Sequence, residues 1–242
     1  MNILEMGRKE LFALPVWKVR EPLSAEEIFH IANIAGALWS YNYDLAEIGN
    51  VGLHAEIKSG RHTDQALNSR FLFQTTNVRR IMAYQIAMCL DGRLSQSPDY
   101  VAGIPNGATG LCKDLAWILG AKEAEMKKCN GGIHLVTEVG AGTVLLADDF
   151  FSVGTGVTEA ALEIHRRQPK ATIVKYIATI VNRGARRIIT VEDVGIFHIS
   201  AVAEKRVQDW DPLECPLCDR GSRPIKFKET DENWNFLINS QK

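Results

Sequence analysis

Two adjacent carboxylates, followed by a loop of small residues, are the group in this sequence best suited to chemistry. Asp148 and Asp149 follow an apolar run, and residues 152–156 read Ser-Val-Gly-Thr-Gly before a helical pattern begins. Amide groups in such a loop, together with the positive end of a helix, bind phosphate. Glycine lets the backbone approach the anion closely. Because the carboxylates would repel a phosphate, we expect them to serve neighbouring hydroxyls, or Mg²⁺ through water.

A ligand with a phosphate at one end and vicinal hydroxyls at the other, such as a ribose 5-phosphate, would satisfy both the loop and the acids. Two other nucleotide-binding patterns are excluded. No Gly-Lys-Ser/Thr follows the glycines, as a Walker A loop requires, and the spacing is not G-x-G-x-x-G. A purely structural interpretation stays open, in which the acid pair caps a helix and the glycines form a turn.

These residues need a scaffold in which strands end where helices begin. From residue 100 onwards the sequence repeats an apolar strand-like run, a turn and a helical stretch. The strand-like runs cover residues 100–104, 143–147 and 171–181, and helical stretches end near Leu119 and cover residues 157–167. This alternation predicts an α/β fold with a central, mainly parallel twisted sheet flanked by helices. Ligands of such sheets bind at the carboxyl ends of the strands.

The N-terminal part predicts a helix over residues 24–48, a strand over 51–57 and a helix over 76–90. We therefore expect three segments. Residues 1–75 form an N-terminal helix and a small hood, residues 76–210 form the core, and residues 211–242 form a C-terminal tail that packs on or beside the core.

Composition and charge limit the possible functions. The chain has 242 residues, 46% of them hydrophobic, and a formal net charge of −1. No global field attracts nucleic acid or an anionic membrane, so neither partner is expected. No apolar run approaches the roughly 20 residues that a membrane span needs, and the start shows no signal-peptide pattern. Five irregularly spaced cysteines argue against a disulfide framework, so a cytoplasmic location is expected.

Residues 144–159 as a unit resemble the phosphoribosyl-pyrophosphate signature of type I phosphoribosyltransferases. The resemblance implies that Asp148 and Asp149 hold the ribose hydroxyls of the substrate. It also implies that Mg²⁺ is the cofactor and that it binds mainly through substrate and water near these acids, with no direct protein ligand. The implied cradle for the 5-phosphate consists of Ser152, Val153, Gly154, Thr155 and Gly156.

Three further segments resemble the orotate phosphoribosyltransferases within that family. Lys58 stands in a Lys-Ser-Gly turn, which implies that it reaches the pyrophosphate or the edge of orotate. Arg183 stands where an arginine lies against orotate, although Asn182 replaces the usual Asp. Asn106 and Gly107 fall in a Gly-rich turn that sits where the family has its pyrophosphate loop.

Residues 121–132 are similar to the mobile catalytic loop of the orotate enzymes. Lys122 matches the loop lysine, and Lys127 or Lys128 would supply the cation that Ala121 lacks. Cations over the leaving pyrophosphate stabilise the transition state, and a closed lid excludes water. In the family this loop crosses into a neighbouring subunit, which implies a homodimer. The alternative is an exposed, charged helix end followed by a Gly-Gly turn.

The C-terminal segment contains a Cys-x-x-Cys pair, Cys215 and Cys218. A structural zinc site needs about four ligands, and no second cysteine pair occurs at the usual spacing. The histidines are scattered along the chain. We therefore expect no metal at this pair, which also occurs in some orotate enzymes.

The resemblance implies transfer of a phosphoribosyl group from phosphoribosyl pyrophosphate to orotate, giving orotidine 5′-monophosphate and pyrophosphate in pyrimidine biosynthesis. Two alternatives stay open. One is a phosphoribosyltransferase for another base, such as a purine or uracil. The other is a non-catalytic, regulatory protein that binds phosphoribosyl pyrophosphate, which the departures at Ala121 and Glu125 favour.

Overall fold

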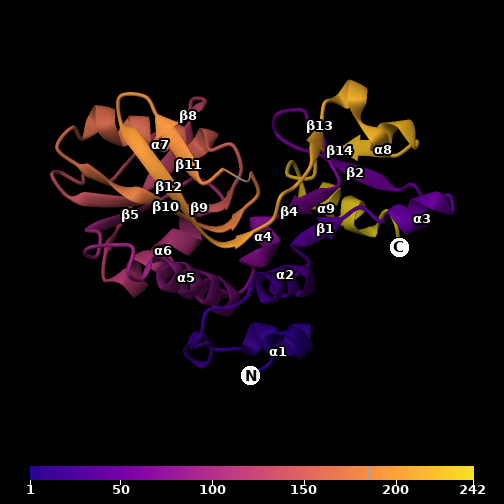
Figure 1. The fold of residues 1–242 in the computed structure, drawn as a ribbon, viewed down its shortest axis with the longest axis horizontal. Coiled ribbons are helices and arrows are strands. Elements are labelled where there is room, and N and C mark those ends of the chain that lie inside the picture. The colour runs from indigo at the N-terminus through magenta and orange to yellow at the C-terminus, as the bar shows by residue number, and fades with distance from the viewer. Residues whose placement is uncertain (185) are drawn as a thin grey trace. The chain divides into compact units, whose positions relative to one another are not determined.

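The computed structural model describes residues 1–184 and 186–242, which form two compact units (Figure 1). The first unit consists of Met1–Ile31 and Ser69–Arg206, and the second consists of Ala32–Asn68 and Val207–Lys242. This division differs from the three expected segments. The first residues of the chain belong with the large sheet, and the last residues complete the second unit.

A six-stranded sheet forms the centre of the first unit, with the strand order β11-β12-β10-β9-β5-β6. Neighbouring strands from β12 to β6 are parallel, and β11 is antiparallel to β12. The strands are β5 (Tyr100–Gly103), β6 (Lys122–Ala124), β9 (Thr143–Phe151), β10 (Thr172–Asn182), β11 (Ile188–Val191) and β12 (Gly195–Glu204). The predicted α/β fold with a mainly parallel sheet is confirmed.

Helices cover both faces of this sheet (Figure 1). On one side α5 (Thr76–Leu90) and α6 (Thr109–Leu119) contact the strands. On the other side lie α7 (Thr155–Arg167) and a hairpin of β7 (Met126–Cys129) and β8 (Gly132–Leu135). Val144 and Leu146 of β9 pack in one core cluster with Ile164 of α7. Because side chains alternate along a strand, Leu145 faces the other layer and is also fully buried.

The direction in which successive strands are added to the sheet reverses between β5 and β9. The chain runs from β5 outward to β6 on one side, then returns to β9 and continues through β10 to β12 on the other side. The connections that leave the carboxyl ends of β5 and β9 therefore diverge. In open α/β sheets this point is where ligands bind.

Strand β9 is longer than predicted and ends at Phe151 rather than Ala147. Its ladder with β10 continues through Asp148 opposite Thr179 and Phe150 opposite Val181. Aromatic residues favour strands, so the pair of phenylalanines extends β9 past the acids. Helix α7 begins at Thr155 instead of Val157.

The helix predicted over residues 24–48 is much shorter than expected. Helix α2 (Ala25–Ile34) ends before Gly36, which has a φ of 72°. The amide of Ala37 donates to the carbonyl of Ala32 at 2.8 Å, as in a glycine-terminated helix. The other short N-terminal elements are η1 (Ile3–Glu5), α1 (Arg8–Ala13), η2 (Val16–Lys18), β1 (Leu38–Ser40), α3 (Tyr43–Glu47) and α4 (Ser69–Leu72).

The second unit combines two distant chain segments. Its sheets have the orders β13-β3-β2-β14 and β1-β4. Its core contains Trp234, which packs against Phe227 at 5.5 Å between ring centroids and donates to the carbonyl of Gly36 at 2.9 Å. The remaining elements are β2 (Leu53–Glu56), β3 (His62–Thr63), β4 (Gln65–Leu67), β13 (Asp209–Trp210), η3 (Pro212–Glu214), α8 (Pro216–Asp219), β14 (Arg223–Ile225) and α9 (Asp231–Asn239). The C-terminal segment is thus an integral part of a folded unit.

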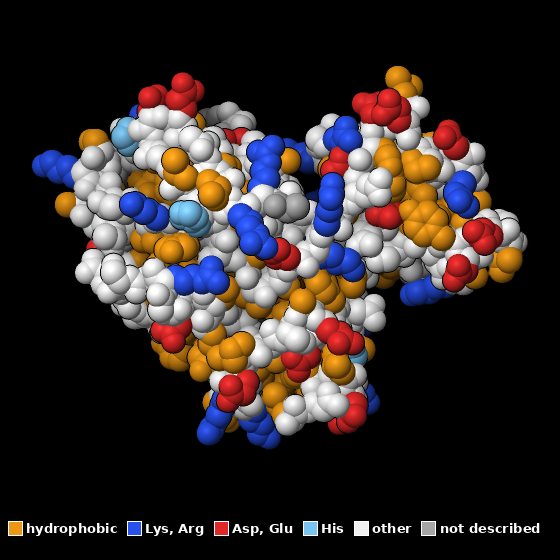
Figure 2. All heavy atoms as spheres, viewed as in Figure 1, with side chains coloured by type: hydrophobic (Ala, Val, Ile, Leu, Met, Phe, Trp, Pro, Cys, Tyr) orange, Lys and Arg blue, Asp and Glu red, His pale blue; other side chains and the backbone are white. Residues whose placement is uncertain are grey.

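Charged side chains of both signs are spread over the face shown in Figure 2, in keeping with a net charge of −1. Within residues 1–184 and 186–242, every helix is too short or too polar to cross a membrane.

Candidate active site

The two acids lie near the carboxyl end of β9, where the strand order reverses between β5 and β9. Asp149 is 9% exposed, and its Oδ1 accepts a hydrogen bond from the amide of Phe150 at 2.8 Å. Asp148 Oδ1 accepts from the amide of Asp149 at 2.9 Å. Burial raises the pKa of Cys112 well above its ordinary range, and the negative charges of Asp148 and Asp149 add to this effect. The thiol therefore stays protonated beneath the acids and is unsuited to act as a nucleophile.

The predicted phosphate cradle is a short, open loop between β9 and α7. Ser152 and Val153 are exposed, and Gly154 has a φ of 85°, a conformation that favours glycine. A Cβ at Gly154 would also lie 3.0 Å from the ring of Phe151. Gly154 is the N-cap of α7, and no side chain caps this helix. The first-turn amides of this 13-residue helix therefore lack a side-chain cap, which suits an anion.

The predicted pyrophosphate loop lies directly against the acids. A Cβ at Gly107 would overlap Asp149 Oδ2 and would lie 2.7 Å from Asp149 Cγ and 3.0 Å from Ser69 Oγ. Gly107 therefore lets the loop after β5 pack against the carboxylate, while Asn106 beside it is exposed. The structure thus brings together the acids and the loop after β5.

The end of β10 joins the same edge. The amide of Arg183 donates to the carbonyl of Phe151 at 2.7 Å, and the Cα of Gly184 lies against the backbone of Ser152. Asn182 is buried, and its side chain donates to the carbonyl of Arg186 at 2.9 Å and accepts from the amide of Gly184 at 3.2 Å. Asn182 therefore fixes the turn that carries Arg183 beside the cradle, a role that its amide group performs better than an acid, which cannot donate.

Lys122, the predicted loop lysine, lies in the edge strand of the central sheet. It opens β6 and pairs with Tyr100, which in turn pairs with Val144 at the amino-terminal part of β9. Asp148 lies four residues further along the parallel strands, roughly 13 Å away at 3.3 Å per residue. The Lys122 ammonium lies 5.9 Å from the centroid of the Tyr100 ring. Lys122 thus lies apart from the acidic pair of its own chain, and its catalytic role stays a prediction.

The expected catalytic loop is a regular β-hairpin. Strands β7 and β8 pair from Met126 opposite Leu135 to Cys129 opposite Gly132. The two turn residues, Asn130 and Gly131, have φ angles of 49° and 81°, as a tight hairpin turn requires. The hairpin follows the carboxyl end of β6 and carries two exposed cations, Lys127 and Lys128. Lys127 pairs with Glu125 at 3.0 Å.

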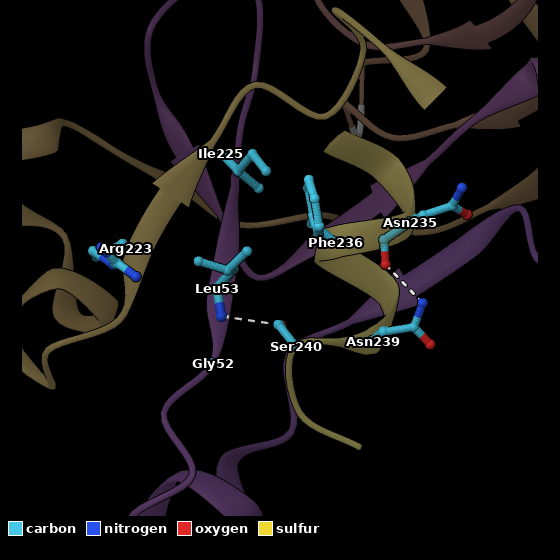
Figure 3. Close-up of a pocket in the computed structure, with 8 residues that line it drawn as sticks. All are labelled: Gly52, Leu53, Arg223, Ile225, Asn235, Phe236, Asn239 and Ser240. Atoms are coloured by element: carbon cyan, nitrogen blue, oxygen red, sulfur yellow. Dashed lines mark hydrogen bonds between the residues drawn. The ribbon is translucent and has the colours of Figure 1, made fainter. Parts of the chain in front are cut away.

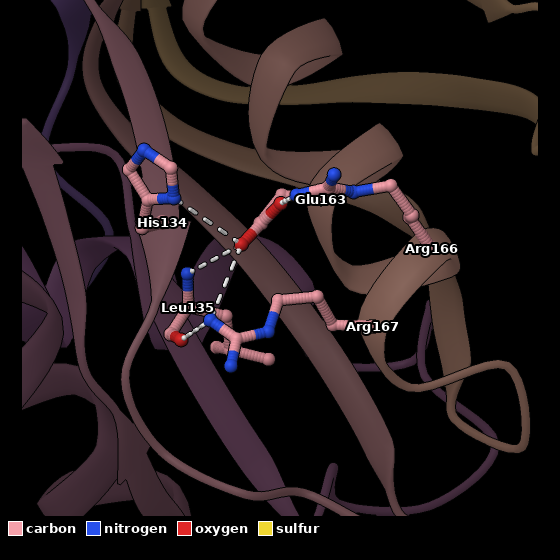
Figure 4. Close-up of polar contacts among 5 residues, drawn as sticks. All are labelled: His134, Leu135, Glu163, Arg166 and Arg167. Carbon is pink, nitrogen blue, oxygen red and sulfur yellow. Dashed lines mark hydrogen bonds and ion pairs between the residues drawn. The ribbon is translucent and has the colours of Figure 1, made fainter. Parts of the chain in front are cut away.

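A buried carboxylate attaches the base of this hairpin to α7 (Figure 4). Glu163 is 6% exposed; it accepts from the amide of Leu135 at 3.2 Å and from Arg166 at 2.7 Å. Arg167 donates to the carbonyl of Leu135 at 3.0 Å, and His134 lies 3.8 Å from the same carboxylate. Burial alone would raise the pKa of Glu163, but the hydrogen bonds from Arg166 and Leu135 hold it below its ordinary value. The base of the hairpin is thus fixed, and the lysines lie towards its tip.

The remaining predicted site residue, Lys58, belongs to the second unit. It is exposed in the turn between β2 and β3, where the amide of Gly60 donates to the carbonyl of Ile57 at 2.9 Å. A groove of about 590 Å³ also lies in this unit, between the β2–β14 pair and α9 (Figure 3). Leu53, Ile225 and Phe236 form its apolar lining, and the predicted site residues are not among those that line it.

One cluster of reactive side chains was missed in the sequence. His54, His62, Cys215 and Cys218 lie together in the second unit, although the histidines look scattered along the chain. The two histidines are eight residues apart on two strands of one hairpin, and the cysteines form a Cys-x-x-Cys pair. This combination of a histidine hairpin and a cysteine pair is the signal that could have revealed the cluster.

Known proteins match this chain in sequence over most of their length. No protein-family model matches the sequence. The orotate phosphoribosyltransferase of a Nitratiruptor species is 26% identical over 184 residues, which is 72% of this chain and 89% of that protein. The enzyme of the same name from Caldanaerobacter subterraneus subsp. tengcongensis is 26% identical over 191 residues, 76% of this chain and 92% of that protein.

Solved structures share the fold. The crystal structure of orotate phosphoribosyltransferase from Aeropyrum pernix matches with a TM-score of 0.55 and 15% identity, over 73% of this chain and 93% of that one. The structure of Leishmania donovani UMP synthase matches with a TM-score of 0.55 and 18% identity, over 77% of this chain and 38% of that one. The chain is therefore similar in sequence to orotate phosphoribosyltransferases over most of its length, and it shares its fold with solved structures of phosphoribosyltransferases.

Proposed function

We propose that the protein is an orotate phosphoribosyltransferase that transfers the 5-phosphoribosyl group from phosphoribosyl pyrophosphate to orotate. The products are orotidine 5′-monophosphate and pyrophosphate. One observation carries the proposal. The loop after β5 packs on Asp149 through Gly107, beside an uncapped helix N-terminus. A carboxylate pair with one anion-binding loop on each side fits a ribose that carries a phosphate at C5 and a pyrophosphate at C1.

Each part of the substrate has a matching group. The 5-phosphate takes the amides and hydroxyls of residues 152–156. The ribose hydroxyls donate to Asp148 and Asp149, which the strand ladder holds near the carboxyl end of β9. The backbone amides around Asn106 and Gly107 receive the pyrophosphate. Arg183 and Lys58 are assigned to orotate and pyrophosphate by resemblance.

A Mg²⁺ ion fits this arrangement. Magnesium prefers oxygen ligands, keeps several waters and binds through one or two carboxylates plus substrate phosphates. Asp148 and Asp149 supply carboxylates at the strand end, and the cradle leaves room for the phosphates. When bound, the ion neutralises charge on the leaving pyrophosphate.

The reaction then depends mainly on positioning and electrostatics. As the bond from C1 to pyrophosphate lengthens, positive charge develops on the ribose, and the nearby acids stabilise it. Orotate brings its own nucleophilic ring nitrogen, so the transfer needs no strong protein base. We assign the cations over the leaving group to Lys128 and Lys127, which are exposed on the hairpin. A homodimer, in which each hairpin serves the neighbouring site, and a cytoplasmic location are part of the same proposal.

The test is a turnover assay with phosphoribosyl pyrophosphate, Mg²⁺ and one base at a time. Orotate should be consumed, which its ultraviolet absorbance reports, and Asp149→Asn should lose most of this activity while it keeps the wild-type melting temperature. Turnover of uracil or hypoxanthine instead of orotate would contradict the base assignment. Tight binding of phosphoribosyl pyrophosphate without turnover of any base would favour the regulatory alternative.

A further inference from the structure

We propose that His54, His62, Cys215 and Cys218 bind one structural Zn²⁺ ion within the second unit. Their ligand atoms all lie within 4.8 Å of one another. His54 is on β2 and His62 begins β3, whereas Cys215 immediately precedes α8 and Cys218 lies within it. The site has no part in the proposed phosphoribosyl transfer and is argued independently of it.

The distances between the donor atoms match those around one tetrahedral zinc ion. With Zn–S near 2.3 Å and Zn–N near 2.0–2.1 Å, tetrahedral geometry separates a sulfur from a nitrogen by about 3.6 Å and two nitrogens by about 3.3 Å. His54 Nε2 lies 3.7 Å from Cys215 Sγ and 3.6 Å from Cys218 Sγ. His62 Nδ1 lies 3.3 Å from Cys218 Sγ and 3.1 Å from His54 Nε2. Small side-chain shifts would place all four atoms around one ion.

A hydrogen bond on the far side of His54 directs its lone pair into the cluster. The hydroxyl of Ser222 donates to the carbonyl of Gly52 at 3.2 Å, so its oxygen accepts from His54 Nδ1 at 3.0 Å. With the ring proton on Nδ1, Nε2 is unprotonated and faces the two sulfurs. Metal-binding histidines are commonly held in one tautomer by such a partner.

The side chains are enclosed in a way that suits a structural site. His54, His62 and Cys215 are 0%, 5% and 1% exposed, and Cys218 is half-buried at the edge. A hydrogen-bonded pair of histidines would share a single proton and would leave two thiols beside it with no function. A zinc ion uses all four donors, and four protein ligands leave no open position for catalysis.

The location of the cluster gives the ion a structural role. The histidines come from Ala32–Asn68 and the cysteines from Val207–Lys242, the two segments that together form the second unit. This unit has on the order of 70 residues, a size at which an apolar core alone gives little stability and small domains use disulfides or metals. Zinc at this position cross-links the two segments, as a disulfide would in an oxidising compartment.

Elemental analysis of the untagged, full-length protein tests the proposal directly. Protein purified without chelators should hold about one zinc per chain, and Cys218→Ser should hold less than about one-tenth of that amount. The matched control is Cys129→Ser, which removes an exposed cysteine outside the cluster and should keep the ion. Co²⁺ added to the metal-free protein should give the intense visible absorption of tetrahedral, thiolate-bound cobalt in the wild type and the control, but not in Cys218→Ser.

A second measurement separates loss of the metal from a general defect of the variant. After removal of zinc, added ZnCl₂ should raise the melting temperature of the wild type and of Cys129→Ser but leave that of Cys218→Ser unchanged. The proposal is overturned if the purified wild type holds no zinc and ZnCl₂ does not change its melting temperature. It is also overturned if Cys218→Ser keeps the ion, or if mass spectrometry of the fresh protein finds Cys215 and Cys218 joined as a disulfide.

Discussion

Replacement of Gly107 by alanine tests whether the pyrophosphate loop and Asp149 form one site. The added Cβ would lie 2.7 Å from Asp149 Cγ, whereas ordinary contacts begin near 3.4 Å. The carboxylate must therefore move by at least about 0.7 Å, because the other close neighbour, Ser69 Oγ at 3.0 Å, narrows the space in which the loop could shift instead.

The expected loss of activity follows from this displacement. A misplacement of about 1 Å at reacting groups reduces rates by roughly 10²-fold. We expect kcat/KM for phosphoribosyl pyrophosphate to fall about 30- to 100-fold, or about 2–3 kcal/mol of transition-state stabilisation. The fold should lose less than about 1 kcal/mol, because Gly107 lies in a turn and is not among the glycines with a left-handed backbone.

Steady-state kinetics with orotate, together with thermal unfolding, measure both quantities. Gly110→Ala is the matched control, since its Cβ would meet only the flexible side chain of Arg79, at 3.3 Å or more, near the start of α6. Its kcat/KM should stay within about threefold of the wild type. If Gly107→Ala kept wild-type kcat/KM with an unchanged melting temperature, the packing of this loop on Asp149 would have no part in catalysis.

Three further predictions follow from the hairpin and the cradle. The initial rate should fall more than about tenfold in Lys128→Ala, because this variant removes a cation from the leaving group, and less than about twofold in Lys122→Ala. A larger loss of rate in Lys122→Ala than in Lys128→Ala would instead assign the catalytic role to Lys122. Glu163→Gln should lower the free energy of unfolding by about 1–2 kcal/mol at pH 7. The pKa of Glu163 is held below its ordinary value, so the wild type should exceed Glu163→Gln in free energy of unfolding at every pH above about 5. This difference in stability should disappear as the pH falls through the lowered pKa. Denaturant titrations at each pH measure it. Gly154→Ala should lower the melting temperature by several degrees, since the left-handed backbone alone costs about 1–2 kcal/mol, and an unchanged melting temperature would contradict the φ of 85°.

The parts of the fold that repeat a strong local pattern could be predicted from the sequence. Buried runs such as residues 143–147 and the helical periodicity after them are dictated by apolar spacing. The acids, the small residues and the helix around Asp148 also follow one another directly in the sequence. This local order was enough to predict a phosphate cradle there. The boundaries were less accurate, because the pairing of Phe150 with Val181 extends β9 and is a non-local effect.

The position of Lys122 in the edge strand could not be predicted for a different reason. The resemblance made Lys122 the loop lysine and left Lys127 or Lys128 to supply the charge that Ala121 lacks, but it did not show which residues enter the edge strand. Strand β6 takes residues 122–124 into its ladder with β5, which fixes Lys122 beside Tyr100. Asn130 and Gly131, a dipeptide typical of two-residue hairpins, were the local signal that the following segment is β-structure.

Local sequence patterns could not predict that two distant chain segments form the second unit. Its two segments are separated by the whole of the six-stranded sheet, and neither contains enough apolar surface to fold alone. The pairing of β3 with β13, and of β2 with β14, shows that they belong together. The same separation hid the four-residue cluster.

This discontinuity has a consequence for biosynthesis. His62 leaves the ribosome roughly 150 residues before Cys215, which at about 5–20 residues per second is a delay of about 8–30 seconds. During that time residues 69–206 can form their sheet, while the hairpin of β2 and β3 remains without the strands beside it. During synthesis, the segment that contains His54 and His62 therefore exposes its apolar and metal-binding groups. These groups become buried only after residues 207–242 have been made and have paired with it.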